Sequence, residues 1–187
     1  MKQQIPLVDV KAQYAPLIPE LEERFSSVLE SGRFIFGPEV EAFEREAAAF
    51  LGVPHTIGVA NGTDALVLAL EALEIGRDDE VICPAFTFYA TAEAIARVGA
   101  TPVFADIDPV TLNLDPQDVA ARVTERTTAI VPVHLFGRPA PVAELAELGV
   151  PLLEDAAQAF GAPGVATTGV CSTFSFFPTK NLFALGD

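Results

Sequence analysis

From residue 55 onward, the sequence alternates between short apolar runs and stretches with helical periodicity. The apolar runs predict β-strands over 55–60, 80–83, 102–105, 128–133, 150–153 and 172–177. The stretches between them predict helices over 64–73, 90–98, 116–123 and 142–148. Parallel strands need crossover connections, so this alternation is typical of a largely parallel sheet with helices on both faces. We therefore expect an α/β protein with three layers, αβα.

Two more helices are predicted in front of this alternating region. Apolar residues recur at helical spacing between Leu17 and Leu29, and Gly32 ends that run. Pro38 suits the first turn of the second helix, whose apolar stripe ends before Gly52. The expected N-terminal helical segment therefore covers about the first 52 residues.

The net charge of −15 restricts the partners that this chain can have. Nucleic-acid binding needs a basic surface, so nucleic acid is not an expected partner. The N-terminus lacks the apolar core of a signal peptide and no stretch is long enough to span a membrane, which predicts a cytoplasmic protein without a membrane partner. Cys83 and Cys171 are expected to be reduced core thiols. The two histidines are far apart in sequence, so no metal site is expected.

Lys180 is the first candidate for chemistry. The chain has three lysines against eight arginines, and it places this lysine just beyond a strand-like run that breaks at Pro178. A lysine amine can form an imine with an aldehyde cofactor, whereas a guanidinium cannot. Ser175 lies five residues earlier and could add a hydroxyl to such a site. The alternative is an ordinary solvated loop lysine.

A second candidate is an anion site at Asn61-Gly62-Thr63-Asp64, between the first strand and the first helix of the α/β region. Glycine permits a tight turn, and the free N–H groups at a helix start attract anions. Thr63 could either cap that helix or bind the anion with its hydroxyl. No Gly-Lys-Ser/Thr follows, and no G-x-G-x-x-G occurs in the chain, which argues against a P-loop or a dinucleotide site.

Further candidates follow other strands. Asp155 ends a strand and could pair with a protonated ring nitrogen, or it could simply cap the next helix. Gln158 is expected one helical turn after Asp155, on roughly the same side, and could bond the same ligand. Phe88 follows another strand and could stack on a ring, although aromatic residues in such places more often pack in the core. His134 is more readily interpreted as a hydrogen-bonded structural histidine than as a catalyst.

Together, the ends of the predicted strands offer an anion site, an aromatic ring, a carboxylate and a lysine. Pyridoxal phosphate needs this set: a phosphate site, a stacking ring, a partner for its pyridine nitrogen and an imine-forming amine. A serine-hydrolase elbow is absent from the sequence. The residues alone therefore favour a pyridoxal 5′-phosphate enzyme.

The sequence resembles the DegT family of pyridoxal-phosphate-dependent nucleotide-sugar aminotransferases, which have the type I, aspartate aminotransferase-like fold. The likeness extends from Ile5 to the last residue. Its motifs are Ile5-Pro-Leu-Val-Asp9, Gly37-Pro-Glu-Val-Glu-Ala-Phe-Glu44, Ala60-Asn-Gly-Thr-Asp-Ala-Leu66, Val131-Pro-Val-His-Leu-Phe-Gly137, Glu154-Asp-Ala-Ala-Gln158 and Ser175-Phe-Phe-Pro-Thr-Lys-Asn-Leu182.

The resemblance implies catalytic roles for two residues. Lys180 would bind the cofactor as a Schiff base and move a proton between Cα of the amino donor and C4′ of the cofactor. Asp155 would keep the pyridine nitrogen protonated. Some relatives carry histidine in place of the lysine and remove a hydroxyl group, so Lys180 argues against that branch.

The resemblance also implies cofactor-binding roles. Phe88 would stack on the ring, and Gln158 would bond its O3′ oxygen. Gly62 and Thr63 would bind the phosphate through backbone N–H and hydroxyl groups, and Ser175 would add its hydroxyl.

The reaction implied by the resemblance is transamination of a keto group on a nucleotide-linked sugar. Glutamate would be the amino donor, and the product would enter cell-surface polysaccharide or glycoside biosynthesis. A homodimer is expected, because the family places the cofactor at a dimer interface. Three alternatives stay open: a non-catalytic relative that binds pyridoxal phosphate or a nucleotide sugar, an inactive fragment, and a nucleotide-binding domain without this cofactor.

The chain is about half as long as members of this family. On that comparison, residues 1–187 would form most of the cofactor-binding large domain, and the small C-terminal domain would be absent. A central strand would also be missing, which would leave unpaired strand edges. We therefore expect a truncated large domain.

Overall fold

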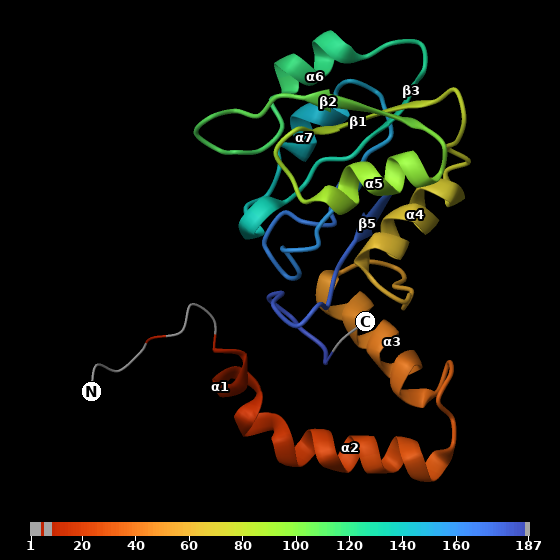
Figure 1. Ribbon diagram of the computed structural model, residues 1–187, viewed down its shortest axis with the longest axis vertical. Helices are drawn as coiled ribbons and strands as arrows, with labels where there is room; N and C mark the ends of the chain where they lie inside the picture. Colours follow the sequence, from red (N-terminus) through yellow and green to blue (C-terminus); the bar gives the residue numbers. More distant parts are fainter. Residues whose placement is uncertain (1–4, 6–8, 186–187) are drawn as a thin grey trace. The chain divides into compact units, whose positions relative to one another are not determined.

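The computed structural model describes residue 5 and residues 9–185 (Figure 1). The chain divides into two compact units, Met1–Gly58 and Val59–Asp187. No helix in the described part of the chain is long and apolar enough to cross a membrane.

The first unit is helical, as predicted. Gly32 and Gly52 adopt left-handed conformations, with φ of 65° and 70°, and end the two longer helices at the predicted positions. Pro38 occupies the first turn of the second of these, where its missing N–H is not needed. The elements are α1 (Val10–Tyr14), the 3-10 helix η1 (Ala15–Leu17), α2 (Ile18–Ser31) and α3 (Pro38–Leu51).

The predicted strand over 55–60 is wrong. This segment is not assigned to a strand and pairs with no strand in the described chain. Its polar groups bond to α3 instead: Thr56 Oγ1 donates to the Glu44 carbonyl at 2.6 Å, and Gly58 N donates to Glu44 Oε1 at 2.7 Å. An apolar run predicts an extended chain, but a strand also needs a partner edge, which sequence does not supply.

The second unit contains a parallel sheet. Its strands are β1 (Glu80–Pro84), β2 (Thr101–Ala105), β3 (Thr127–Ile130), β4 (Leu153–Asp155) and β5 (Cys171–Thr173). β1 pairs in parallel with β2 and β3, and β4 pairs in parallel with β5. Two parallel bridges, Ile130 to Leu152 and Val133 to Asp155, join the two groups. The spatial order is therefore β2-β1-β3-β4-β5, and the largely parallel sheet is confirmed.

The last predicted strands have different limits in the structure. β5 ends at Thr173, whose carbonyl accepts the Ala156 N–H, and residues 174–177 leave the sheet. β4 reaches Asp155, two residues beyond the prediction, because Asp155 N bonds the Pro132 carbonyl. These shifts place Asp155 inside the sheet.

Helices cover both faces of the sheet, which confirms the three-layer arrangement. α4 (Gly62–Ala72) and α5 (Tyr89–Arg97) lie side by side on one face (Figure 1). α6 (Pro116–Arg122) and α7 (Val142–Ala146) pack on the other, and the 3-10 helix η2 (Leu135–Gly137) follows β3.

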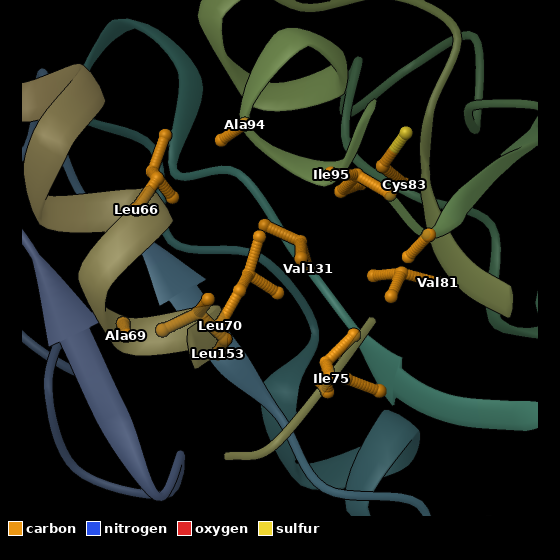
Figure 2. Close-up of a cluster of buried hydrophobic side chains, with 12 residues drawn as sticks. Leu66, Ala69, Leu70, Ile75, Val81, Cys83, Ala94, Ile95, Val131 and Leu153 are labelled. Atoms are coloured by element: carbon orange, nitrogen blue, oxygen red, sulfur yellow. The ribbon is translucent and has the colours of Figure 1, made fainter. Parts of the chain in front are cut away.

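Two hydrophobic clusters hold the layers together. In the first, Leu66 and Leu70 of α4 and Ile95 of α5 meet Val81 and Val131 of the sheet (Figure 2). Each such side chain, once buried, contributes about 1.5–3 kcal/mol to stability. The second cluster contains the neighbours that point to the opposite face, namely Ile82, Ile130 and Leu152, with Val119 of α6 and Leu145 of α7.

The strand order determines where a ligand can bind. The order reverses between β1 and β3, so the connections that follow these two strands diverge to opposite sides. In open α/β sheets such a point leaves a crevice at the carboxyl ends of the strands. The segments after β1, β4 and β5 meet there.

Candidate active site

All seven residues singled out from the sequence line one cleft in the second unit. The cleft has a volume of about 360 Å³, which falls in the usual range for small-molecule sites. Segments that are far apart in the sequence contribute to it, from the start of α4 to the loop after β5. The seven residues are Gly62, Thr63, Phe88, Asp155, Gln158, Ser175 and Lys180.

The start of α4 presents free N–H groups to the cleft. Asn61 is the N-cap: its Oδ1 accepts from Asp64 N at 2.9 Å, and its carbonyl accepts from Ala65 N at 3.0 Å. The N–H groups of Gly62 and Thr63 bond to no acceptor in the described chain. Thr63 is therefore not the cap, and its hydroxyl stays available with the two N–H groups for an anion.

Gly62 is required by the close approach of Ser175. A Cβ at position 62 would lie 2.8 Å from Ser175 Cβ and 3.3 Å from Ser175 Oγ. Only glycine allows the loop after β5 to bring the serine hydroxyl this near to the helix start. Two motifs more than a hundred residues apart therefore meet at the same part of the cleft.

Asp155 is buried at the end of β4 and points to the α5 side. Thr91 Oγ1 donates to its Oδ2 at 2.8 Å, and Ala157 N donates to its Oδ1 at 3.2 Å. Burial raises the pKa of Asp155 above its usual value, although these two hydrogen bonds and the charge of Lys180 act in the opposite direction. No helix follows Asp155, so the capping interpretation is wrong. A buried carboxylate of this kind gains most from a cationic N–H partner.

Lys180 and Phe88 lie near each other in the cleft. Lys180 Nζ is 6.0 Å from the centre of the Phe88 ring, and Lys180 N donates to the Phe177 carbonyl at 2.8 Å. Phe88 is 69% exposed, so it does not pack in the core. Its ring is thus available to stack on a planar ligand next to the amine.

Gln158 has a defined amide orientation. Its Oε1 accepts from Phe136 N at 2.8 Å, and Phe136 has a left-handed backbone, with φ of 55°. Because the oxygen is used by a backbone donor, the NH₂ group remains to donate. Gln158 can therefore bond an oxygen of a ligand in the cleft.

His134 is structural, as its interpretation from the sequence proposed. It is fully buried, and its Nδ1 accepts from Ala140 N at 2.9 Å, so Nε2 carries the proton. Nε2 then donates to Glu154 Oε2 at 2.8 Å.

Glu154 is held by a set of donors on the opposite face of β4 from Asp155. Its carboxylate accepts from the backbone N–H groups of Ala166 at 3.0 Å and Gly169 at 2.7 Å. Burial alone would raise the pKa of Glu154, but the hydrogen bonds from His134 and from these N–H groups leave it below the usual value.

Two residues of the site were missed from the sequence. Thr91 bonds Asp155, and Thr87 lines the cleft with its Oγ1 3.0 Å from Thr91 Oγ1. The available signal was a pair of threonines at i and i+4 around Phe88, where α5 begins.

Residues 17–187 match the DegT/DnrJ/EryC1/StrS aminotransferase family. A pleiotropic regulatory protein of Geobacillus stearothermophilus is 49% identical, over 98% of this chain and 51% of the relative. UDP-N-acetyl-3-dehydro-alpha-D-glucosamine 3-aminotransferase of Acidithiobacillus ferrooxidans is also 49% identical, over 98% of this chain and 52% of the relative.

Solved structures agree with the sequence matches. The structure of NtdA from Bacillus subtilis with bound cofactor PMP has a TM-score of 0.94 and 30% identity, over 100% of this chain and 44% of that one. The chain spans about half the length of the relatives that it matches. Since the family match covers most of its residues, the chain belongs to the DegT/DnrJ/EryC1/StrS aminotransferase family.

Proposed function

We propose that this chain carries the pyridoxal 5′-phosphate site of an aminotransferase that acts on a nucleotide-linked keto sugar. The main support for this proposal is that Lys180, Asp155 and the start of α4, with its free N–H groups, line the same cleft. An anion site, a buried carboxylate and an amine are three different requirements of one cofactor. The family of the chain supports the same assignment.

The residues present fit the phosphate and the ring of such a cofactor. The N–H groups of Gly62 and Thr63 and the hydroxyl of Ser175 would hold the phosphate, since the missing Cβ at position 62 lets Ser175 approach the start of α4. Phe88 would stack on the ring, and the NH₂ group of Gln158 would donate to its O3′ oxygen.

Asp155 and Lys180 would do the chemistry that the protein contributes. When bound, pyridoxal phosphate supplies a protonated ring that withdraws electrons from the carbon bearing the transferred amino group. Asp155 would accept the N–H of that ring and would favour its protonated form, because the carboxylate is buried. Lys180 would be the amine that holds the cofactor at its aldehyde carbon and, once released, would carry a proton between Cα of the donor and C4′.

Glutamate is the proposed amino donor, and the acceptor is a keto group on a sugar joined to a nucleotide. The name of the Acidithiobacillus relative, a UDP-sugar 3-aminotransferase, supports a sugar acceptor of this class. The product would serve cell-surface polysaccharide or glycoside biosynthesis. The described residues are proposed to make up most of the large domain, and the working enzyme is proposed to be a homodimer.

A second candidate function is regulation without catalysis. The regulatory name of the Geobacillus relative favours it, but a pure binder needs no lysine amine beside the carboxylate. Both functions share the cofactor site and differ in whether an amino group is transferred.

The first test is borohydride reduction of the chain after addition of pyridoxal phosphate, followed by mapping of the labelled peptide. Label is expected on Lys180 and is expected to disappear in Lys180→Arg, since a guanidinium forms no imine. Lys11→Arg is the matched control, because Lys11 is exposed on α1 and outside the cleft. Absence of label on a folded chain would overturn the proposal.

Glutamate then separates the two candidate functions. Conversion of the bound cofactor to its amine form with release of 2-oxoglutarate supports the aminotransferase. A chain that is labelled at Lys180 but does not react with glutamate or any other amino donor argues against the aminotransferase and is the result expected of a regulatory binder or of an inactive fragment.

A further inference from the structure

Two threonines behind Asp155 have no role in the function proposed above. Thr91 is 1% exposed, and its Oγ1 donates to Asp155 Oδ2 at 2.8 Å. Thr87 is half-buried at the wall of the cleft, and its Oγ1 lies 3.0 Å from Thr91 Oγ1. A continuous line of hydrogen bonds thus runs from the cleft wall to the buried carboxylate.

The chemistry of the three side chains decides which group donates in each of these hydrogen bonds. An ionised carboxylate only accepts hydrogen bonds, and a threonine hydroxyl has a single proton. Thr91 must therefore give its proton to Asp155, and its oxygen accepts the proton of Thr87. A chain of hydrogen bonds with one direction polarises each member and strengthens the bond at its end.

The same turn of chain also carries Phe88. Phe88 is the N-cap of α5, Thr87 comes directly before it, and Thr91 lies in the first turn of the helix. The chain entry into α5 brings the two threonine hydroxyls to 3.0 Å. The Phe88 carbonyl accepts the Thr91 N–H at 3.3 Å. The element that offers the stacking ring is therefore the element that orients the carboxylate.

Asp155 can accept further hydrogen bonds while Thr91 and Ala157 hold its carboxylate. Thr91 uses one lone pair of Oδ2, and Ala157 N uses one of Oδ1, whereas a carboxylate has about four acceptor positions. The carboxylate is thus fixed from the protein side and can still accept an N–H from the cleft.

We propose that Thr91 is a positioning residue that fixes the ionised carboxylate of Asp155 toward the cofactor ring, and that Thr87 directs the proton of Thr91 to it. This inference rests on the proposed function, because it assigns Asp155 to the ring nitrogen. Thr91 acts through Asp155 and touches no reacting atom itself.

The decisive measurement is a pH titration of Asp155 in the chain without cofactor. Carbon NMR of the Asp155 side-chain carboxyl monitors this titration in wild type and in Thr91→Val. Valine keeps the shape of threonine and removes the donor, so the pKa of Asp155 should rise further, since less then opposes its burial. Lys180 and His134, the other charged or titratable groups that act on Asp155, are unchanged in both proteins. Thr91→Ser keeps the hydroxyl and should restore the wild-type titration.

Cofactor affinity provides a second measurement. Thr91→Val should bind pyridoxal phosphate roughly ten-fold more weakly than wild type, while Thr91→Ser stays within about three-fold. Thr87→Val should change the Asp155 titration in the same direction but by less, because Thr91 keeps its own proton.

The outcomes separate this inference from the proposed function. A purely structural Thr91 would change the melting temperature of Thr91→Val and leave the titration of Asp155 as in wild type, which would overturn the inference. An unchanged titration in Thr87→Val would overturn the role of Thr87. A wild-type chain that binds no cofactor would overturn the proposed function, and the titration without cofactor would still decide the role of Thr91.

Discussion

Gly62→Ala tests whether the cleft depends on the contact between the start of α4 and the loop after β5. The new Cβ would lie 2.8 Å from Ser175 Cβ and 3.4 Å from the Phe174 carbonyl oxygen. Ordinary contacts of this kind are about 3.5–4 Å, so the serine segment has to move by several tenths of an ångström. Forced overpacking of this sort costs about 1–3 kcal/mol.

The helix propensity of alanine acts in the opposite direction. Alanine is favoured over glycine within a helix by about 1 kcal/mol, and less at its first position. The net destabilisation expected for Gly62→Ala is therefore about 1–2 kcal/mol. Displacement of the Ser175 hydroxyl also removes one donor to a bound anion, which should weaken pyridoxal phosphate binding by roughly ten-fold or more.

The assays are urea unfolding of the cofactor-free chain and a titration with pyridoxal phosphate. Gly76→Ala is the matched control, because a Cβ there would meet only the Val98 carbonyl oxygen at 3.6 Å. That variant should be as stable as wild type or slightly more stable and should bind the cofactor normally. If Gly62→Ala matches wild type in both stability and affinity, the argument from close approach is refuted.

Three more predictions concern the titratable groups. Asp155→Asn should stabilise the cofactor-free chain at neutral pH by about 1 kcal/mol, since burial disfavours the charged form of Asp155. The same variant should abolish the proposed amino transfer. A variant that is less stable than wild type in thermal melts would contradict the expected stabilisation. Glu154 has a lowered pKa, so its contribution to stability is full above the unfolded value near 4.5 and is lost as the pH falls through the lower folded value. Urea midpoints of wild type should therefore fall more steeply in acid than those of Glu154→Gln. At pH 7 this variant should be less stable than wild type by about 2 kcal/mol. Parallel plots of urea midpoint against pH for the two proteins would argue against a contribution of the Glu154 carboxylate to stability. Cys83 lies in the core as expected, whereas Cys171 is exposed and the expectation of a core thiol there is wrong. Burial raises the pKa of Cys83 to about 12, so iodoacetamide at pH 8 should modify Cys171 first and Cys83 only after unfolding. Equal rates in the native chain would show that the Cys83 site opens.

The neighbouring residues Glu154 and Asp155 of β4 place their carboxylates in two different environments. Successive residues of a strand point to opposite faces, so Asp155 lies on the side of Leu153 and α5, and Glu154 on the side of Leu152. One carboxylate meets Thr91 and the cleft, and the other meets His134 and backbone donors. Burial governs the pKa of the first, and hydrogen bonds govern that of the second.

Local patterns in the sequence were sufficient for most elements of the fold. Gly32 and Gly52 were placed correctly as helix ends, because a left-handed residue after a helix strongly favours glycine. The strand over 55–60 was predicted wrongly, because its apolar run describes an extended backbone and says nothing of a partner. The same limitation explains why the end of β5 was placed too late at Phe177 instead of Thr173.

The sequence by itself determined the class of the fold, the family and the set of residues proposed to bind a cofactor, because periodicity, glycine positions and motifs are local properties of the chain. It also included Lys180, Asp155 and Ser175 without showing that they meet. Only the tertiary structure decided that these residues line one cleft, that Asn61 and not Thr63 caps α4, and that Thr91 holds Asp155. Those contacts join residues that are far apart along the chain or depend on which face of β4 each residue occupies, and both are settled only when the sheet and its helices pack.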